Sequence, residues 1–265
     1  MSGTRSATLK APATEAWPAG AALLLCSHGS PAAGAAVAAR ARGLRGRQGF
    51  QETAGCLLYG EPRLEEVLAG LSAEVVRLVP LFMAEGVTLS ALRARLADLP
   101  CPERVQLCPP LGSHPALADH VAETALAGMA ERAWSPSETA LVLVGHGSRR
   151  SEASRLATER LAGALARGGA FAGVAVALLE NGPALDGVVD SLTASRAVVI
   201  GCFAEAGAHA AEDVPQLLSR VARPTAYLGP LGMAPWVDDL ILDQAAEPPA
   251  RAPRPAWHGL EETCR

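Results

Sequence analysis

The octapeptide LLLCSHGS at residues 23–30 is repeated as LVLVGHGS at residues 141–148. Both are apolar runs of strand length that end in His-Gly-Ser. Three further pairs of segments match in the same order, at residues 57–62 and 178–183, 79–86 and 200–207, and 110–112 and 230–232. The copies are offset by 118, 121, 121 and 120 residues, and spacing this regular indicates an internal duplication.

Each copy alternates short apolar runs with helical stretches. The runs lack the period-two alternation of a half-exposed strand, which indicates parallel strands buried on both faces. This alternation predicts an α/β fold with a doubly wound parallel sheet in each copy. We therefore expect two duplicated lobes that face a central cleft, at residues 19–133 and 138–245. Residues 1–18 are interpreted as a disordered leader, and the proline-containing residues 246–265 as a flexible tail.

Composition excludes several classes of protein. Hydrophobic residues make up 49% of the 265 residues, but no apolar run approaches the roughly 20 residues of a membrane span. The first 18 residues also lack the apolar core of a signal peptide, so we expect a soluble, cytoplasmic protein without a membrane partner.

The net charge of −4 argues against nucleic acid, which normally leaves a basic footprint on its partner. No GxGxxG or GxxxxGK[ST] motif occurs, so neither a dinucleotide nor ATP is indicated. The six scattered cysteines include no CxxC pair, and we expect neither a disulfide nor an iron–sulfur site.

Three residues of the second copy combine metal-binding chemistry with matching positions. His146, Glu180 and His209 all follow predicted strands, and the carboxyl ends of parallel strands meet at one edge of a sheet. Two imidazoles and a carboxylate form a plausible site for a divalent metal, and histidine also accepts protons near neutral pH. The alternative is that each histidine only forms a hydrogen bond within its loop. The equivalent positions of the first copy hold His28, Tyr59 and Thr88.

Further residues are candidate contacts to the substrate. His28 would contribute from the opposite wall of the cleft. Arg149 and Arg150 follow His146 closely and could bind substrate carboxylates by charge-assisted hydrogen bonds, although a solvated helix start is an equal alternative. Ser148 is interpreted first as a helix N-cap, and it is a candidate substrate contact because of its place beside His146.

Taken together, these motifs resemble the sirohydrochlorin chelatases, the class II chelatases of cobalamin and sirohaem synthesis. The resemblance rests on His-Gly-Ser after the first strand, on Leu-Glu followed by Pro at residues 179–183, and on PLG at 230–232. It rests also on the segment FAEAGAHAAEDVP at residues 203–215. The resemblance covers about 225 of 265 residues and implies the long form, in which two fused halves enclose the tetrapyrrole.

The resemblance also implies an activity. It implies insertion of a divalent metal into sirohydrochlorin without ATP, with Co²⁺ favoured and Fe²⁺ next, and with no cofactor beyond the substrate metal. It matches the family's metal-binding and proton-handling residues to His146, Glu180 and His209. Long members commonly carry the complete set in their first half, whereas Tyr59 and Thr88 stand there in this chain. We therefore expect the active site in the second lobe.

Two other functions were considered. A non-catalytic carrier of metal or tetrapyrrole with the same fold is the main alternative. A histidine phosphatase would require arginine directly before His-Gly, where this chain has Ser27 and Gly145. The sequence does not predict the oligomeric state.

Overall fold

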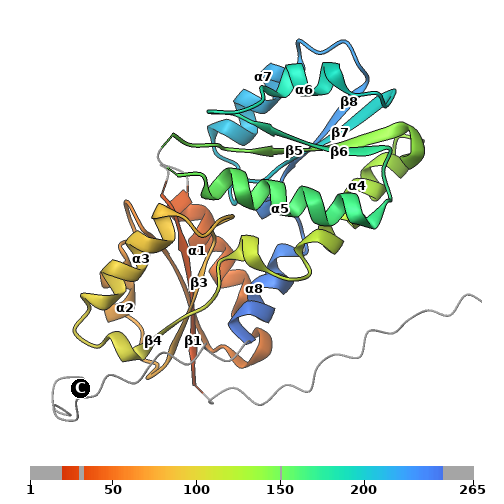
Figure 1. The fold of residues 1–265 in the computed structure, drawn as a ribbon. Helices are drawn as coiled ribbons and strands as arrows, with labels where there is room; N and C mark the ends of the chain where they lie inside the picture. The colour runs from red at the N-terminus through yellow and green to blue at the C-terminus, as the bar shows by residue number, and fades with distance from the viewer. Residues whose placement is uncertain (1–19, 30–32, 150, 247–265) are drawn as a thin grey trace, which may run out of the picture.

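The computed structural model describes residues 20–29, 33–149 and 151–246, which form two parallel four-stranded sheets (Figure 1). The expected leader, all of the expected tail except Ala246, and Arg150 lie outside the described residues. The first sheet has the strand order β2-β1-β3-β4, and its strands are β1 Ala22–Ser27, β2 Glu52–Leu57, β3 Val76–Pro80 and β4 Val105–Leu107. The second has the order β6-β5-β7-β8, and its strands are β5 Thr139–Gly145, β6 Gly173–Leu178, β7 Arg196–Gly201 and β8 Thr225–Pro230. The same order in both sheets confirms the predicted duplicated α/β architecture.

The central strands are buried along their whole length. Every residue of β1, β3 and β5 is buried, which explains why these runs read as continuously apolar in the sequence. The helices of the first copy are, in chain order, α1 Ala33–Leu44, α2 Leu64–Ala69, α3 Val87–Ala97 and α4 Leu117–Ala130. Their counterparts are α5 Ala153–Gly168, α6 Leu185–Ser191 and α7 Val214–Leu218, followed by α8 Val237–Ala246.

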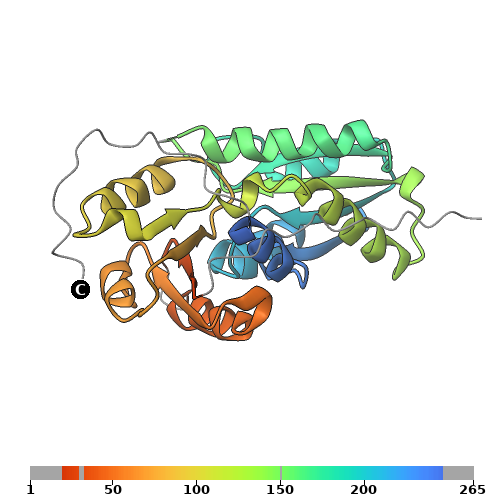
Figure 2. The same ribbon diagram turned by 90° about the horizontal axis from the view of Figure 1, so that it is seen from below.

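The last helix of each copy packs against the sheet of the other copy. Helix α8 lies beside the first sheet in both ribbon views (Figures 1 and 2), where the buried Arg77 of β3 donates from Nε to the carbonyl oxygen of Ala245 at 3.0 Å. Helix α4 lies against the second sheet, and a Cβ placed on Gly128 would come within 2.6 Å of Leu228 in β8. The spatial lobes therefore differ from the sequence repeats by this exchange of helices.

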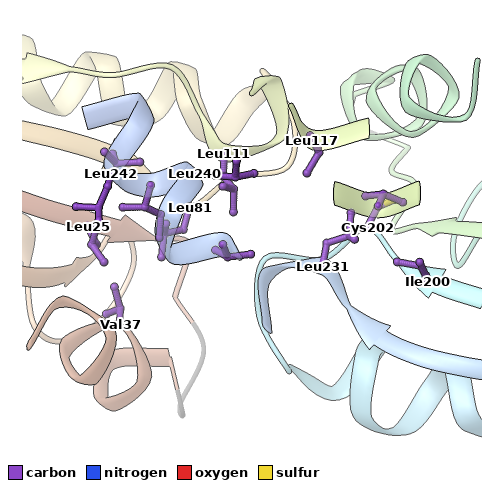
Figure 3. Close-up of a cluster of buried hydrophobic side chains, with 14 of the residues drawn as sticks. Leu25, Val37, Leu81, Leu111, Leu117, Ile200, Cys202, Leu231, Leu240 and Leu242 are labelled. Atoms are coloured by element: carbon purple, nitrogen blue, oxygen red, sulfur yellow. The ribbon is translucent and has the colours of Figure 1, made fainter. Parts of the chain in front are cut away.

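The exchange joins the two lobes through one hydrophobic core. Figure 3 shows Leu240 and Leu242 of α8 beside Leu25 and Leu81 of the first lobe. The same cluster continues to Leu117, at the start of α4, and to Ile200, Cys202 and Leu231 of the second lobe. Burial of apolar surface along this continuous cluster holds the cleft between the lobes in a defined geometry.

Two further features bear on the sequence predictions. No helix in residues 20–29, 33–149 or 151–246 is both long and apolar enough to span a membrane. Cys26, Cys56, Cys108 and Cys202 are free thiols. Cys101, in contrast, is disulfide-bonded, so the expectation of no disulfide is wrong at this position.

Candidate functional site

The three predicted ligands follow three strands of the second sheet. His146 follows β5, and Glu180 lies just beyond the end of β6. His209 begins a π-helical turn, His209–Asp213, that comes after β7. Strands β5 and β7 are neighbours in the sheet, and β5 pairs on its other side with β6. The chain thus reverses its direction of winding between β5 and β7, which is where doubly wound sheets bind their ligands.

The imidazoles of His146 and His209 lie together at this point. Their ring centroids are 4.7 Å apart and their planes are inclined by 43°. The ring of Phe203 lies 6.5 Å from that of His209 and forms an apolar side of the site. His146 is partly buried, and His209 is the more exposed of the two, with 48% of its side chain accessible to solvent. The pair is therefore accessible from one side and shielded on the other.

The surroundings lower the pKa of His146 below its usual value of 6.5. Burial is the largest cause, because it disfavours the imidazolium form. The nearby His209 and His28 lower the pKa further, and Glu180 acts in the opposite direction. A neutral imidazole at physiological pH offers a nitrogen lone pair to a metal or to a proton.

A close backbone contact ties His146 to Glu180. Gly147 has φ +70°, and a Cβ at this position would lie 1.9 Å from the carbonyl oxygen of Glu180. The amide of Glu180 also donates to the carbonyl oxygen of His146 at 2.9 Å. Both the positive φ and the close approach of the Glu180 carbonyl oxygen require glycine at position 147. The glycine of the His-Gly-Ser motif is thus needed for the approach of two strand ends.

The first lobe repeats this turn with different side chains. Gly29 has φ +121°, and a Cβ there would lie 1.9 Å from the carbonyl oxygen of Tyr59. The amide of Tyr59 donates to the carbonyl oxygen of His28 at 2.9 Å, and the two rings are 5.3 Å apart. The duplicated backbone therefore presents an aromatic pair where the second lobe presents histidine and glutamate. The electrostatic effect of His28 on His146 places the first lobe's histidine within range of the second lobe's site.

His209 has a side-chain partner, Asp213, that is not predicted from the sequence. Nδ1 of His209 lies 2.6 Å from Oδ2 of Asp213, four residues further along the chain. The only sequence signal for this contact is the spacing of four residues, which brings side chains to the same face of a helix.

The remaining predicted contacts are placed less specifically. Ser148 is half-buried and Arg149 is exposed, both directly after the His146-Gly147 turn. The N-cap position of α5 is occupied by Glu152, so the interpretation of Ser148 as a helix N-cap is wrong, because four residues separate Ser148 from the first residue of the helix, Ala153. Arg150 lies outside the described residues.

No group of three or more His, Cys, Asp or Glu side chains within the described part of the chain is close enough to hold a metal ion. Within the predicted set, the two imidazoles are in ring contact, and Glu180 is exposed.

A cavity of about 240 Å³ lies between the lobes beside this site. One wall comes from the first lobe and is mostly apolar, with Val37 and Leu81, but it also includes Arg40 and Ser27, the residue before His28. The other wall is formed by residues 204–207, which directly precede His209, and by Met233. The predicted cleft thus reaches the strand-end residues of both lobes.

The protein has two paired α/β lobes, with two imidazoles beyond the carboxyl ends of neighbouring parallel strands and a cavity between the lobes. These features define a chelatase-like protein. A model of the CbiX family matches residues 22–126 and 140–248, one match in each repeat. The chain therefore belongs to the CbiX family, the sirohydrochlorin chelatase family to which the sequence motifs pointed.

Known relatives agree with this assignment. The chain is 25% identical, over an alignment 266 positions long, to a probable sirohydrochlorin cobaltochelatase of Halobacterium salinarum, and the match covers 85% of this chain and 91% of the relative. A solved CbiX, described as the terminal enzyme for biosynthesis of siroheme in denitrifying bacteria, is 28% identical with a TM-score of 0.72. That match covers 84% of this chain and 97% of the other. A multi-domain protein of Deinococcus radiodurans with structural similarity to chelatases is 30% identical, with a TM-score of 0.70 over 86% of this chain and 55% of the other.

Proposed function

We propose that this protein inserts a divalent metal into sirohydrochlorin without ATP, as a cytoplasmic step of cobalamin or sirohaem biosynthesis. Co²⁺ is the favoured metal and Fe²⁺ the next. The observation that carries the proposal is the pair of imidazoles, His146 and His209, beyond the carboxyl ends of the neighbouring parallel strands β5 and β7 and beside the cavity between the lobes. Membership of the CbiX family supports the same activity.

Metal insertion requires a partly desolvated M²⁺ at the face of the macrocycle and the removal of two pyrrole N–H protons. His209 and His146 would supply nitrogen ligands, which suit first-row divalent metals. The lowered pKa of His146 keeps its ring neutral near pH 7, so this residue can also accept a proton. Glu180, exposed at the end of β6, would transfer protons to solvent or complete the coordination. Assistance by a general base of this kind accelerates reactions by about 10²–10⁴-fold.

The cavity provides a surface for the macrocycle itself. Its wall is largely apolar, with Val37, Leu81 and Met233 among its side chains, and burial of the flat tetrapyrrole against such a wall is favourable. Because the substrate carries many carboxylates, cations are needed at the rim of a protein with a net charge of −4. Arg149 and Arg150, together with His28 and Ser148, are the proposed contacts to the substrate.

Chemical affinity alone does not select the metal. Co²⁺ binds nitrogen ligands more strongly than Fe²⁺ does, but Ni²⁺ binds more strongly than either. One relative is named a probable cobaltochelatase and another is described as an enzyme of siroheme biosynthesis, so their names support Co²⁺ and Fe²⁺ as candidate metals. The preference for Co²⁺ over Fe²⁺ is part of our proposal.

The proposal is tested by incubating the purified protein anaerobically with sirohydrochlorin and, in turn, Co²⁺, Fe²⁺ or Ni²⁺, with and without ATP. Metalation is followed by absorbance. We expect rates above the uncatalysed reaction, highest with Co²⁺ and unchanged by ATP. If the protein binds metal or sirohydrochlorin but never exceeds the uncatalysed rate with any of the three metals, it is a carrier and the enzyme proposal is wrong.

A further inference from the structure

The helical segment after β7 begins with one wide turn. Residues His209–Asp213 form a π-helix, in which the amide of Val214 donates to the carbonyl oxygen of His209. The equivalent segment of the first lobe, Val87–Ala97, is a regular α-helix. Wide turns of this kind are rare and occur often at functional sites.

The core positions of the two segments show what the wide turn accommodates. In the first lobe the buried residues Leu89 and Leu92 are three positions apart, whereas in the second lobe the buried residues Ala210 and Val214 are four positions apart. The π turn therefore holds one additional residue between two core contacts. This frees Asp213 from the core position that the constant offset of 121 residues would assign to it.

Asp213 uses this freedom to contact His209. Its Oδ2 lies 2.6 Å from Nδ1 of the imidazole, and both side chains are about half exposed. At the same offset of 121, the first lobe has Thr88 in place of His209 and the buried Leu92 in place of Asp213. The histidine, its carboxylate and the π turn are thus present together in one lobe and absent together in the other.

The hydrogen bond determines which nitrogen of His209 is free. An ionised carboxylate only accepts hydrogen bonds, so Nδ1 of His209 must carry the proton that it donates. In the neutral ring the lone pair then lies on Nε2. Histidines that bind metals usually donate their other ring nitrogen to a carboxylate, carbonyl or water, which fixes the tautomer and the orientation of the ring.

His146 lacks an equivalent partner. Its Nδ1 is buried and forms no hydrogen bond with any residue of the described ranges. Of the two imidazoles that lie 4.7 Å apart, His209 is therefore the one oriented by a carboxylate.

We propose that Asp213 is a positioning residue, which holds His209 as the Nδ1–H tautomer and so directs Nε2 toward the incoming divalent metal. The π turn is the backbone adaptation that places Asp213 there. This inference deepens the proposed chelatase function and rests on it. The competing explanation is an ordinary helix-surface pair of residues four apart, which would contribute little to stability and would have no effect on metal binding.

Three variants separate these explanations. Asp213→Ala removes the acceptor, whereas Asp213→Asn keeps an amide oxygen that can accept from Nδ1–H. Glu212→Ala is the matched control, because it removes an exposed carboxylate from the same turn. The ring tautomer of His209 is read from ¹⁵N chemical shifts of the metal-free protein. The dissociation constant for Co²⁺ alone is measured by titration, and kcat and KM for Co²⁺ are measured in the sirohydrochlorin assay.

The proposal predicts that Asp213→Ala shifts His209 to a mixture of tautomers and weakens Co²⁺ binding about 10–100-fold. Asp213→Asn should restore most of the Nδ1–H tautomer and most of the affinity, and Glu212→Ala should match wild type. If Asp213→Ala retains the wild-type tautomer and affinity, the positioning role is wrong. If Asp213→Ala does not fold, Asp213→Leu removes the acceptor with the side chain that the first lobe has at the equivalent position, Leu92, and retention of the wild-type tautomer and Co²⁺ affinity in that variant overturns the role. The tautomer and the Co²⁺ affinity need no turnover, so failure of the chelatase proposal is recognised separately by the metalation rate of the wild type.

Discussion

His146 and His209 lie in ring contact at 4.7 Å although they come from different strand ends of the second sheet. The contact follows from the strand order, because β5 and β7 are paired neighbours whose carboxyl ends meet at the point where the winding reverses. It has an electrostatic consequence. Burial of His146 disfavours its protonation, and the neighbouring ring of His209 adds to this effect.

We therefore expect the imidazole of His146 to titrate with a pKa below 6.5 when its ring protons are followed by NMR. His209→Ala should raise the pKa without restoring it fully, because burial is the larger cause. A value at or above 6.5 in the wild type would contradict the described environment.

The same shift predicts how stability depends on pH. With the pKa of His146 lower in the folded protein, the unfolded chain binds this proton more readily. The free energy of unfolding should therefore decrease as the pH falls from above 6.5 through the folded-state pKa. His146→Asn should weaken this dependence in urea titrations at several pH values. Equal pH dependence in the variant and the wild type would show that His146 does not contribute.

The glycine of the second His-Gly-Ser motif is expected to be essential for the turn. Gly147→Ala places a Cβ against the carbonyl oxygen of Glu180 and forces alanine to φ +70°, so the free energy of unfolding should fall by at least about 1–3 kcal/mol. Gly163→Ala is the control. It lies within α5, where a Cβ has room, and should increase stability by up to about 1 kcal/mol. Similar values for both variants in urea unfolding would disprove the close contact.

The sequence was sufficient to predict the sheets and the convergence of His146 with His209. Both predictions rest on local patterns, namely the repeated His-Gly-Ser motif and uninterrupted apolar runs. The exchange of α4 and α8 could not be predicted, because an apolar helix face such as that of Leu240 does not specify which sheet it covers. Tertiary packing also determines that Val214 is buried and that Asp213 turns to His209. The N-cap assignment of Ser148 failed because α5 begins several residues beyond the motif.

The exchange of helices predicts unequal effects of two arginines that both contact α8. Arg77 is buried and donates to Ala245 in α8 and to Gln106. Arg77→Ala leaves these acceptors without their donor, so the free energy of unfolding should fall by about 2–4 kcal/mol. Arg47 instead forms an exposed ion pair with Asp239, and Arg47→Ala should cost less than about 1 kcal/mol. Denaturant unfolding of both variants measures the difference, and equal losses would contradict the anchoring role of Arg77.

The location of the site in the second lobe is the central claim, and three single variants in the anaerobic Co²⁺–sirohydrochlorin assay test it most directly. His146→Ala and His209→Ala should each lower the rate of metalation at least about 10²-fold, since each removes a ligand and a proton acceptor. His28→Ala changes the equivalent histidine of the first lobe and should retain most of the activity. A loss of activity in His28→Ala, with His146→Ala and His209→Ala close to wild type, would place the chemistry in the first lobe and contradict the account.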